Sequence, residues 1–306
     1  MIWKNKEEYS KSFSLAKMVT DLPVRIGIIG AGDVGRNLLL GLRLLGKDCL
    51  SELSFWEKNP FQAERVLHEV GVIRSVIDPL VPLYFEEDLS SNDIVVYAAS
   101  GGVPPLGEEK QADVRLMQFG TNADILTHWV TTLESEGFNG LYFILSDPVD
   151  FLCQFAVESL GVSAERVIGF GQGVMYARAA FYGGEQVHIY GPHGAGLWVA
   201  NDPLHYDPIL SQELTKKTRV ENIYIREIGF KPFIGPAFSS GALSMLSYIR
   251  SETHYASHFL GGIYWGEQYS PKDGYWHIEP INDDRLFTDI LKTYERCERD
   301  VRQLLD

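Results

Sequence analysis

Two side chains in the second half of the sequence, His193 and Arg178, are of the types needed to reduce or oxidise an acidic substrate. Histidine is the usual proton donor to a carbonyl because its ordinary pKa lies close to neutral pH. Arginine orients acidic substrates because its planar fork binds a carboxylate bidentately. His193 lies between glycines in IYGPHGAG, directly after a predicted strand, and Arg178 is the only charge in GQGVMYARAAF. An exposed position for Arg178 on an amphipathic helix is the alternative, which these two segments leave open.

A glycine motif near the N-terminus predicts a dinucleotide site. GAGDVG places Gly30, Gly32 and Gly35 in the spacing G-x-G-x-x-G, after a strand that begins near residue 24. A helix is predicted to follow, from Asp33 to about Leu45. Glycines at the three positions allow a tight turn, close approach of a pyrophosphate, and packing of the helix on the strand.

Glu57, at the end of the second predicted strand, favours NAD over NADP as the cofactor. A carboxylate there binds the ribose hydroxyls of NAD and repels the 2′-phosphate of NADP, although Lys58 and Arg65 soften this preference. Besides the glycines and Glu57, the predicted cofactor site includes Asp33, Val34, Ala99 and Ser146.

The elements that must position these residues alternate between buried strands and helices, which is typical of a parallel, doubly wound α/β sheet. Strands are predicted in ELSFWEKNP, NDIVVYAAS and GLYFILSDPVD, and helices in PFQAERVLHEVG and around NADILTHWVTTLESEG. The later segments predict shorter strands, a helix in GPAFSSGALSMLSYIRS, aromatic-rich strands and a C-terminal amphipathic helix. We therefore predict a helical N-terminal arm (residues 1–23), an NAD-binding Rossmann domain (24–165) and an α+β substrate and catalytic domain (166–306).

The composition is typical of a globular protein and argues against several classes of function. A net charge of -14 over 306 residues disfavours a broad nucleic-acid or anionic-lipid surface, but it is compatible with a local anion pocket. The three cysteines are far apart, so neither a disulfide framework nor a cysteine zinc site is predicted. No segment resembles a secretory signal or a membrane span, and we expect a cytoplasmic protein. His254 and His258 have a spacing that could place both on one helix face, but the zinc motif is incomplete, so no metal is predicted.

The order of these motifs resembles the lactate and malate dehydrogenase family over nearly the whole chain after residue 23. IGIIGAGDVGRNLL looks like the nucleotide fingerprint of the family, ILSDPVD like its S-N-P-V-D strand end, ERVIGFGQGVMYARAAF like its segment with the substrate arginine, and GPHG like its G-E-H-G. The resemblance implies that His193 is the catalytic acid/base and Arg178 the clamp for the substrate carboxylate. It also implies that Arg115, in RLMQFGTNADI, polarises the carbonyl. Family members are commonly dimers or tetramers, so a homodimer or homotetramer is expected.

The sequence departs from the family pattern at three positions. Met175 stands where the family has the aspartate that orients the histidine, and Asp147 where it has the asparagine that contacts the reacting oxygen. Pro105 stands where malate enzymes have a specificity arginine, in a loop that is longer than usual and apolar at its tip. We assign Met175 and Ser239 to the substrate site and Asp147 to the catalytic site. Capping of a helix is an equal alternative for Ser239.

These departures leave two classes of function open. The first is an NAD-dependent oxidoreductase that acts on a 2-oxo or 2-hydroxy acid other than malate, with Asp147 facing His193 in place of the missing orienter. Because a carboxylate near the reacting atom favours a cationic iminium, an imine reductase or amine dehydrogenase is the alternative within this class. The second class is an NAD-binding sensor or scaffold with weakened catalysis. A small acidic molecule is the expected partner.

Overall fold

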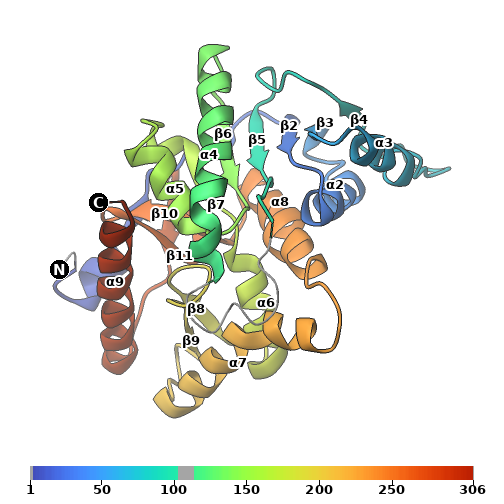
Figure 1. The fold of residues 1–306 in the computed structure, drawn as a ribbon. Coiled ribbons are helices and arrows are strands. Elements are labelled where there is room, and N and C mark those ends of the chain that lie inside the picture. The colour runs from blue at the N-terminus through green and yellow to red at the C-terminus, as the bar shows by residue number, and fades with distance from the viewer. Residues whose placement is uncertain (1–2, 103–113, 306) are drawn as a thin grey trace.

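The computed structural model describes residues 3–102 and 114–305. A parallel sheet occupies the first half of the chain, and Figure 1 shows helices on both of its faces. Its elements are, in chain order, β2 (Val24–Ile29), α2 (Asp33–Leu45), β3 (Leu50–Trp56), α3 (Pro60–Glu69), β4 (Leu83–Phe85), β5 (Ile94–Tyr97), α4 (Val114–Ser135), β6 (Leu141–Ile144), α5 (Val149–Glu158) and β7 (Val167–Gly169). The predicted α/β class and each predicted strand and helix of this half are confirmed, while β4 was not predicted.

Strand β5 shows why the sheet needs helices on both faces. Ile94 and Val96 belong to one apolar core, with side chains of α2 and α8 (Ser244–Ile249). Val95 and Tyr97 point the other way and belong to a second core with α4 and α5. Because successive side chains of a strand alternate between faces, an entirely apolar strand such as IVVY must be covered on both sides.

The second half of the chain extends the same sheet with antiparallel strands. Its elements are the 3₁₀ turn η2 (Ala164–Arg166), α6 (Gln172–Gly183), β8 (His188–Tyr190), β9 (Trp198–Ala200), α7 (Pro208–Glu227), η3 (Pro236–Leu243), α8, β10 (His254–Leu260), β11 (Ile263–Lys272), β12 (Tyr275–Ile278) and α9 (Asp284–Leu305). With the N-terminal strand β1 (Phe13–Ser14), the strand order β1-β12-β11-β10-β7-β6-β5-β2-β3-β4 joins both halves, and β8 and β9 form a separate hairpin. The parallel part includes β7, so it continues past the predicted boundary at residue 165.

The N-terminal arm differs from the predicted helix. Only Lys6–Ser10 (α1) is helical, and Phe13–Ser14 (β1) pairs with β12 at the edge of the sheet. Trp3 and Tyr9 are buried and belong to the main core, with ring contacts from Trp3 to Tyr294 and from Tyr9 to Phe287. Burial of these aromatic rings holds the arm against the C-terminal elements, which propensity within the arm cannot reveal.

The aromatic-rich strands predicted after residue 253 are confirmed as β10, β11 and β12. His254 and His258 lie on β10, so they do not share a helix face; their Nε2 atoms are 3.1 Å apart and both rings are buried in the core. The helix predicted in GPAFSSGALSMLSYIRS begins as the π-helical segment η3 before it becomes α8. No helix within the described ranges is both long and apolar enough to cross a membrane. Over the same residues no three His, Cys, Asp or Glu side chains gather so that they could hold a metal ion.

Candidate active site

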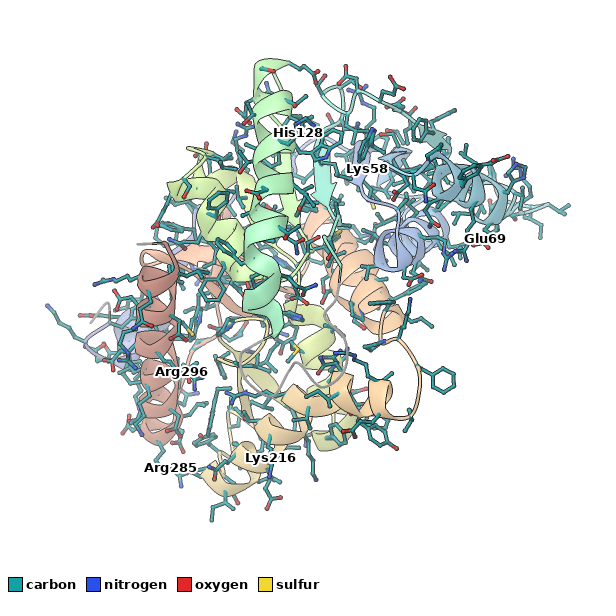
Figure 2. The ribbon with its side chains drawn as sticks, viewed as in Figure 1. Lys58, Glu69, His128, Lys216, Arg285 and Arg296 are labelled. Atoms are coloured by element: carbon teal, nitrogen blue, oxygen red, sulfur yellow. The ribbon has the colours of Figure 1, made fainter. Side chains whose placement is uncertain are left out.

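A cavity of about 1800 Å³ opens at the carboxyl ends of the parallel strands and reaches from the glycine turn to α7. Ligands of doubly wound sheets bind at this edge. The residues of the predicted cofactor site that line it are Gly30, Gly32, Asp33, Val34, Glu57, Ala99 and Ser146. Figure 2 labels Lys58 and His128, which line the same cavity beyond β3 and on α4.

The three glycines of the turn have different surroundings, so the absence of a side chain matters for a different reason at each. Gly30 has φ of +89°, and a Cβ there would lie 2.6 Å from the Cα of Ala99. A Cβ on Gly35 would lie 2.0 Å from the Gly30 carbonyl oxygen, so Gly35 serves helix packing, and it does not line the cavity. A Cβ on Gly32 would have no other atom within 4 Å, so the space at the N-terminus of α2 is open. Such a terminus binds phosphate groups through its free N–H groups and its dipole.

Glu57 and Lys231 place opposite charges at the two sides of this turn. The Glu57 carboxylate accepts hydrogen bonds from the backbone N–H of Ala31 at 2.8 Å and of Asn59 at 3.0 Å. Lys231 lies 3.5 Å from the Asp33 carboxylate and also lines the cavity. A carboxylate beyond β3 and a cation beside the helix N-terminus match the ribose and pyrophosphate groups of a dinucleotide, so the residues present fit NAD.

His193 lies at the opposite end of the cavity, where three contacts fix it. Its Nδ1 lies 2.7 Å from the Gly171 carbonyl oxygen, and its backbone N–H donates to Asp150 at 2.6 Å. Its Nε2 lies 3.5 Å from Asp147 Oδ1. A carbonyl oxygen can only accept, so Nδ1 carries a proton and Nε2 is the atom that exchanges one. A Cβ on Gly171 would lie 2.6 Å from the His193 Cγ, so only glycine at position 171 leaves room for the ring in this position.

Asp150 is a buried acid that the sequence analysis did not select. Its two carboxylate oxygens accept hydrogen bonds from the His193 N–H and from the Ser257 hydroxyl. Burial raises the pKa of Asp150 to about 6. The residue lies in the first turn of α5, three positions after Asp147, and it positions the loop that presents His193. The only feature of the sequence that could have indicated Asp150 was its position in SDPVD, directly after the predicted strand.

Asp147 follows β6 and is positioned by α4. Its backbone carbonyl accepts a hydrogen bond from Asn122 Nδ2 at 2.6 Å, and Asn122 Oδ1 accepts one from the Gly101 N–H at 2.8 Å. Asn122 thereby connects the ends of β5 and β6. The structure thus brings Asp147 to His193, as predicted, but on the Nε2 side of the ring, so it does not take the position of an acid that orients Nδ1.

Arg178 and Met175 lie together on α6. Arg178 Nη1 is 3.7 Å from the Met175 sulfur, and the Arg178 side chain lines the cavity. Met175 is fully buried and does not line the cavity. The cavity-facing residues of this segment, Gly171, Val174 and Arg178, recur at helical spacing. Arg178 is therefore a cavity residue, whereas the assignment of Met175 as a substrate contact is wrong.

Ser239 was also misplaced by the sequence analysis. The neighbouring Ser240 lines the cavity, and its hydroxyl oxygen accepts a hydrogen bond from the Val174 N–H at 2.8 Å. Ser239 does not line the cavity, and its carbonyl oxygen accepts a hydrogen bond from Ser244. Capping is not its role either, since η3 begins at Pro236. The π-helical turn shifts which residue faces inward, and helical spacing alone could not show this shift.

Two predicted features fall outside the described part of the chain. The backbone of Arg115 lies in the first turn of α4, but its side chain is not among those described. Pro105 and the apolar loop tip lie within residues 103–113, which are also outside the described residues. The polarising role of Arg115 and the shape of the loop therefore stay predictions.

The comparisons with known proteins agree with this geometry. The sequence model described as lactate/malate dehydrogenase, NAD binding domain, matches residues 24–169. An L-lactate dehydrogenase of Mesomycoplasma hyopneumoniae (strain 232) is 28% identical over 189 residues, which is 58% of this chain and 58% of that relative. One of Lactococcus lactis subsp. cremoris (strain NZ9000) is 30% identical over 149 residues, 48% of this chain and 45% of that one. The match therefore spans less than two thirds of either relative.

Solved structures share the fold over nearly the whole chain. The minor L-lactate dehydrogenase from Enterococcus mundtii has a TM-score of 0.74 at 18% identity and covers 94% of this chain and 98% of that one. The malate dehydrogenase from Aeropyrum pernix has a TM-score of 0.71 at 19% identity, covering 92% and 100%. Residues 24–169 therefore match the NAD-binding domain of the lactate/malate dehydrogenases, and the chain as a whole shares their fold. The match confirms the predicted resemblance over this half of the chain, and it confirms NAD as the cofactor.

The protein orients its histidine without the aspartate that the lactate/malate dehydrogenase pattern places at position 175. The carbonyl oxygen of Gly171 accepts the Nδ1 hydrogen bond instead. A carbonyl fixes the tautomer as a carboxylate does, but it adds no full negative charge behind the ring. The nearest carboxylate lies in front of the ring instead, where Asp147 Oδ1 is 3.5 Å from Nε2.

The sequence analysis also missed the part of α7 that forms a wall of the cavity. Arg219, Asn222, Ile223 and Arg226 line it, at positions that share one helix face. Arg219 donates to the Leu197 carbonyl oxygen at 3.0 Å. The helical period of cations in LTKKTRVENIYIRE was the available signal, but it is also typical of a solvated face.

Proposed function

We propose that this protein is an NAD-dependent oxidoreductase that interconverts a 2-oxo acid and the corresponding 2-hydroxy acid. The observation that carries the proposal is the orientation of His193, whose Nδ1 contacts the Gly171 carbonyl oxygen and whose Nε2 faces the cavity and Asp147. Arg178 lines the same cavity. A proton donor and a carboxylate clamp in one cavity with a nucleotide site meet the needs of this reaction.

Each residue has one task in the proposed mechanism. Arg178 binds the substrate carboxylate and fixes the carbonyl oxygen near His193. The protonated ring, held by Gly171 and paired with Asp147, gives its Nε2 proton to that oxygen and keeps its Nδ1 proton. NADH, when bound, supplies the hydride. Arg115 is proposed to polarise the carbonyl. In the oxidation direction His193 Nε2 takes the proton back.

Asp147 supports a second candidate reaction. Its Oδ1 lies 3.5 Å from His193 Nε2, on the side where the reacting atom is expected. A carboxylate there opposes a developing alkoxide and favours a cationic iminium. Reduction of an imine formed from an oxo acid and an amine is therefore the alternative.

Two observations bear in opposite directions on whether the substrate carries a second carboxylate, as malate does. Pro105 supplies no cation for a second carboxylate. Arg219 and Arg226, however, add two cations to the described wall of the cavity. Comparing oxaloacetate with monocarboxylic 2-oxo acids decides which observation matters, and we propose that the monocarboxylic acids react faster.

The test is NADH consumption with a panel of 2-oxo acids, in stopped flow, with and without ammonia or a primary amine. We expect turnover of at least one monocarboxylic 2-oxo acid without amine, at a rate that the amine does not raise. Turnover that requires the amine would support the imine reaction. Tight NADH binding with no turnover of any acid, with or without amine, would contradict both reactions and support a sensor.

A further inference from the structure

A second cavity, of about 730 Å³, lies between α7 and α9, beside the active site. Figure 2 labels Lys216 on α7 and Arg296 on α9, one on each wall. On α9 the charged lining positions are Asp289, Lys292, Arg296 and Arg299, which recur at three or four residues and so share one helix face. The cavity is of a size that accommodates a small molecule.

The lining of this second cavity is strongly cationic in a chain with a net charge of -14. Its five cations are Lys216, Arg219, Lys292, Arg296 and Arg299, and its two acids are Glu213 and Asp289. Asp289 lies 3.3 Å from Lys292 and accepts a hydrogen bond from the Tyr206 hydroxyl at 2.7 Å. With Glu213 counted as well, the lining keeps an excess of three positive charges.

Two of these arginines are held by backbone carbonyls instead of carboxylates. Arg219 donates to the Leu197 carbonyl oxygen at 3.0 Å, and Arg296 to that of Gly196 at 2.9 Å. Within the described ranges no hydrogen bond or ion pair joins either guanidinium to an acid. Burial, and then the like charge of Arg296, lower the pKa of Arg219 to about 10. An anion between these side chains would remove the repulsion and bind both planar forks.

The carbonyls that hold the arginines belong to the segment that follows His193. Gly194 and Ala195 line the active-site cavity, and Arg219 lines both cavities. The arginines thus connect the second cavity to the backbone that presents the histidine. A ligand that fixes them also fixes residues 194–197, and the two sites are then linked reciprocally.

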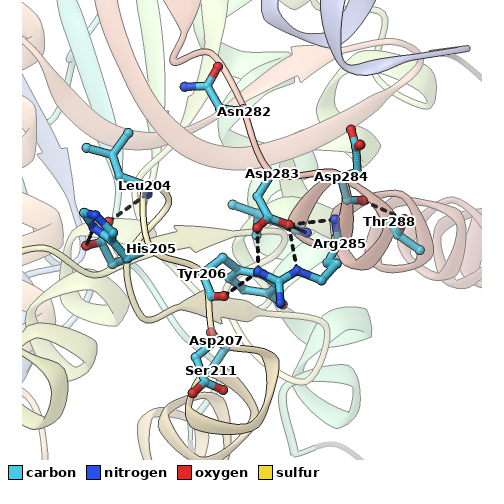
Figure 3. A network of polar contacts seen from close by, with 12 residues as sticks. Leu204, His205, Tyr206, Asp207, Ser211, Asn282, Asp283, Asp284, Arg285 and Thr288 are labelled. Atoms are coloured by element: carbon cyan, nitrogen blue, oxygen red, sulfur yellow. Dashed lines mark hydrogen bonds and ion pairs between the residues drawn. The ribbon is translucent and has the colours of Figure 1, made fainter.

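A polar network holds the two helices at one end of the second cavity (Figure 3). Arg285, in the first turn of α9, donates to the Tyr206 carbonyl oxygen at 2.9 Å and pairs with Asp283 at 2.7 Å. Asp207 caps α7 through the N–H groups of Ile209 and Leu210. The network fixes the starts of α7 and α9 next to each other, so the cavity is preformed. A ligand that binds there loses little free energy in ordering the side chains around it.

We propose that the cavity between α7 and α9 binds a multivalent, phosphate-bearing anion, and that the bound anion stabilises the segment 194–197 behind His193. The site shares Arg219 with the active-site cavity, but it contains none of the residues to which we assign NAD binding, proton transfer or the carboxylate clamp. Its test therefore does not depend on the identity of the substrate.

The experiment uses protein saturated with NADH, so that the phosphate positions of the nucleotide site are occupied. Thermal unfolding is followed against pyrophosphate, with the ionic strength held constant by chloride. We expect a saturable rise in Tm, since a ligand that binds only the folded state stabilises it. The rise should be lost in the double variant Lys216→Gln/Arg299→Gln, whose positions are exposed and tolerate substitution.

The matched control is Lys217→Gln/Arg302→Gln, which removes the same charge from the same helices outside the cavity. It should keep the full rise in Tm. Equal rises in both double variants, or no rise in the unsubstituted protein, would overturn the site. Hydrogen exchange of peptides that cover residues 194–199 should slow with pyrophosphate in the unsubstituted protein and the control only. Unchanged exchange despite a rise in Tm would overturn the link to the His193 segment.

Discussion

His188 and His193 lie in one short stretch of the chain, and each presents its Nε2 to an acid. Glu267 Oε1 lies 3.9 Å from His188, and Asp147 Oδ1 lies 3.5 Å from His193. The two imidazole side chains are similarly exposed, at 10% and 9%. The acids differ, because the Glu267 side chain is 0% exposed and that of Asp147 is 36% exposed.

The two pairs therefore differ in their environment although their residue types match. Burial raises the pKa of Glu267 to about 8 and lowers the pKa of His188 to about 4. At neutral pH both groups are then uncharged, and Tyr9 and Trp265 donate hydrogen bonds to the Glu267 carboxyl. The Asp147 side chain, in contrast, lines the cavity and is partly exposed there. A histidine beside an acid indicates a proton donor only where the acid keeps access to water or substrate.

Replacing the two histidines in turn tests this difference with the largest expected effect. We expect His193→Asn to lower kcat by about 10²–10⁴, the usual contribution of a general acid/base. His188→Asn should leave kcat close to that of the unsubstituted protein and act on stability alone. Steady-state kinetics with NADH and a 2-oxo acid measure both. Undiminished turnover in His193→Asn would refute the catalytic role of the cavity pair.

Arg178 provides a second test of the difference between the two pairs, because it lines the same cavity as His193 and Asp147. We expect Arg178→Leu to raise the KM for the oxo acid roughly 10- to 100-fold, since hydrogen bonds to charged groups contribute about 1.5–3 kcal/mol. NADH affinity should not change. Met175→Leu is the matched control on the same helix, and its KM should stay unchanged because Met175 does not line the cavity. A similar KM in all three proteins would show that Arg178 does not bind the carboxylate.

Glu267→Gln tests the core pair through stability. The pKa of Glu267 is raised in the folded protein, so the stability it contributes is fully present below pH 4.5 and is lost as the pH rises through about 8. Between pH 6.5 and 8.5 the unsubstituted protein should lose about 2 kcal/mol more of its unfolding free energy than Glu267→Gln. The depressed pKa of His188 acts only below about pH 6.5, so it does not interfere. Denaturant titrations at both pH values measure the loss, and equal losses would mean that Glu267 is not neutral in the fold.

Sequence patterns predicted the nucleotide half because its constraints act on residue types. Gly30 and Gly35 are required by contacts under 3 Å, and α2 has the predicted bounds Asp33–Leu45. The position of Glu57 follows from the length of β3. Such features leave a readable pattern at fixed spacing.

The rest of the site depends on contacts that leave no such pattern. The Gly171 carbonyl that orients His193 is a backbone atom, and any residue carries one. The inward turn of Ser240 in place of Ser239 follows from the π-helical segment η3. Asp150 and Arg219 are positioned by tertiary packing, and sequence spacing cannot tell them from structural or exposed charges.

Heteronuclear NMR of the imidazole nitrogens tests the central claim most directly, with His193→Asn used to assign the His193 signals. The spectrum above the titration of His193 reports which nitrogen carries the proton in the neutral ring. The account predicts the Nδ1–H tautomer, because Nδ1 lies 2.7 Å from the Gly171 carbonyl oxygen, and a bare Nε2 that faces Asp147 and the cavity. A neutral ring protonated at Nε2 would contradict it.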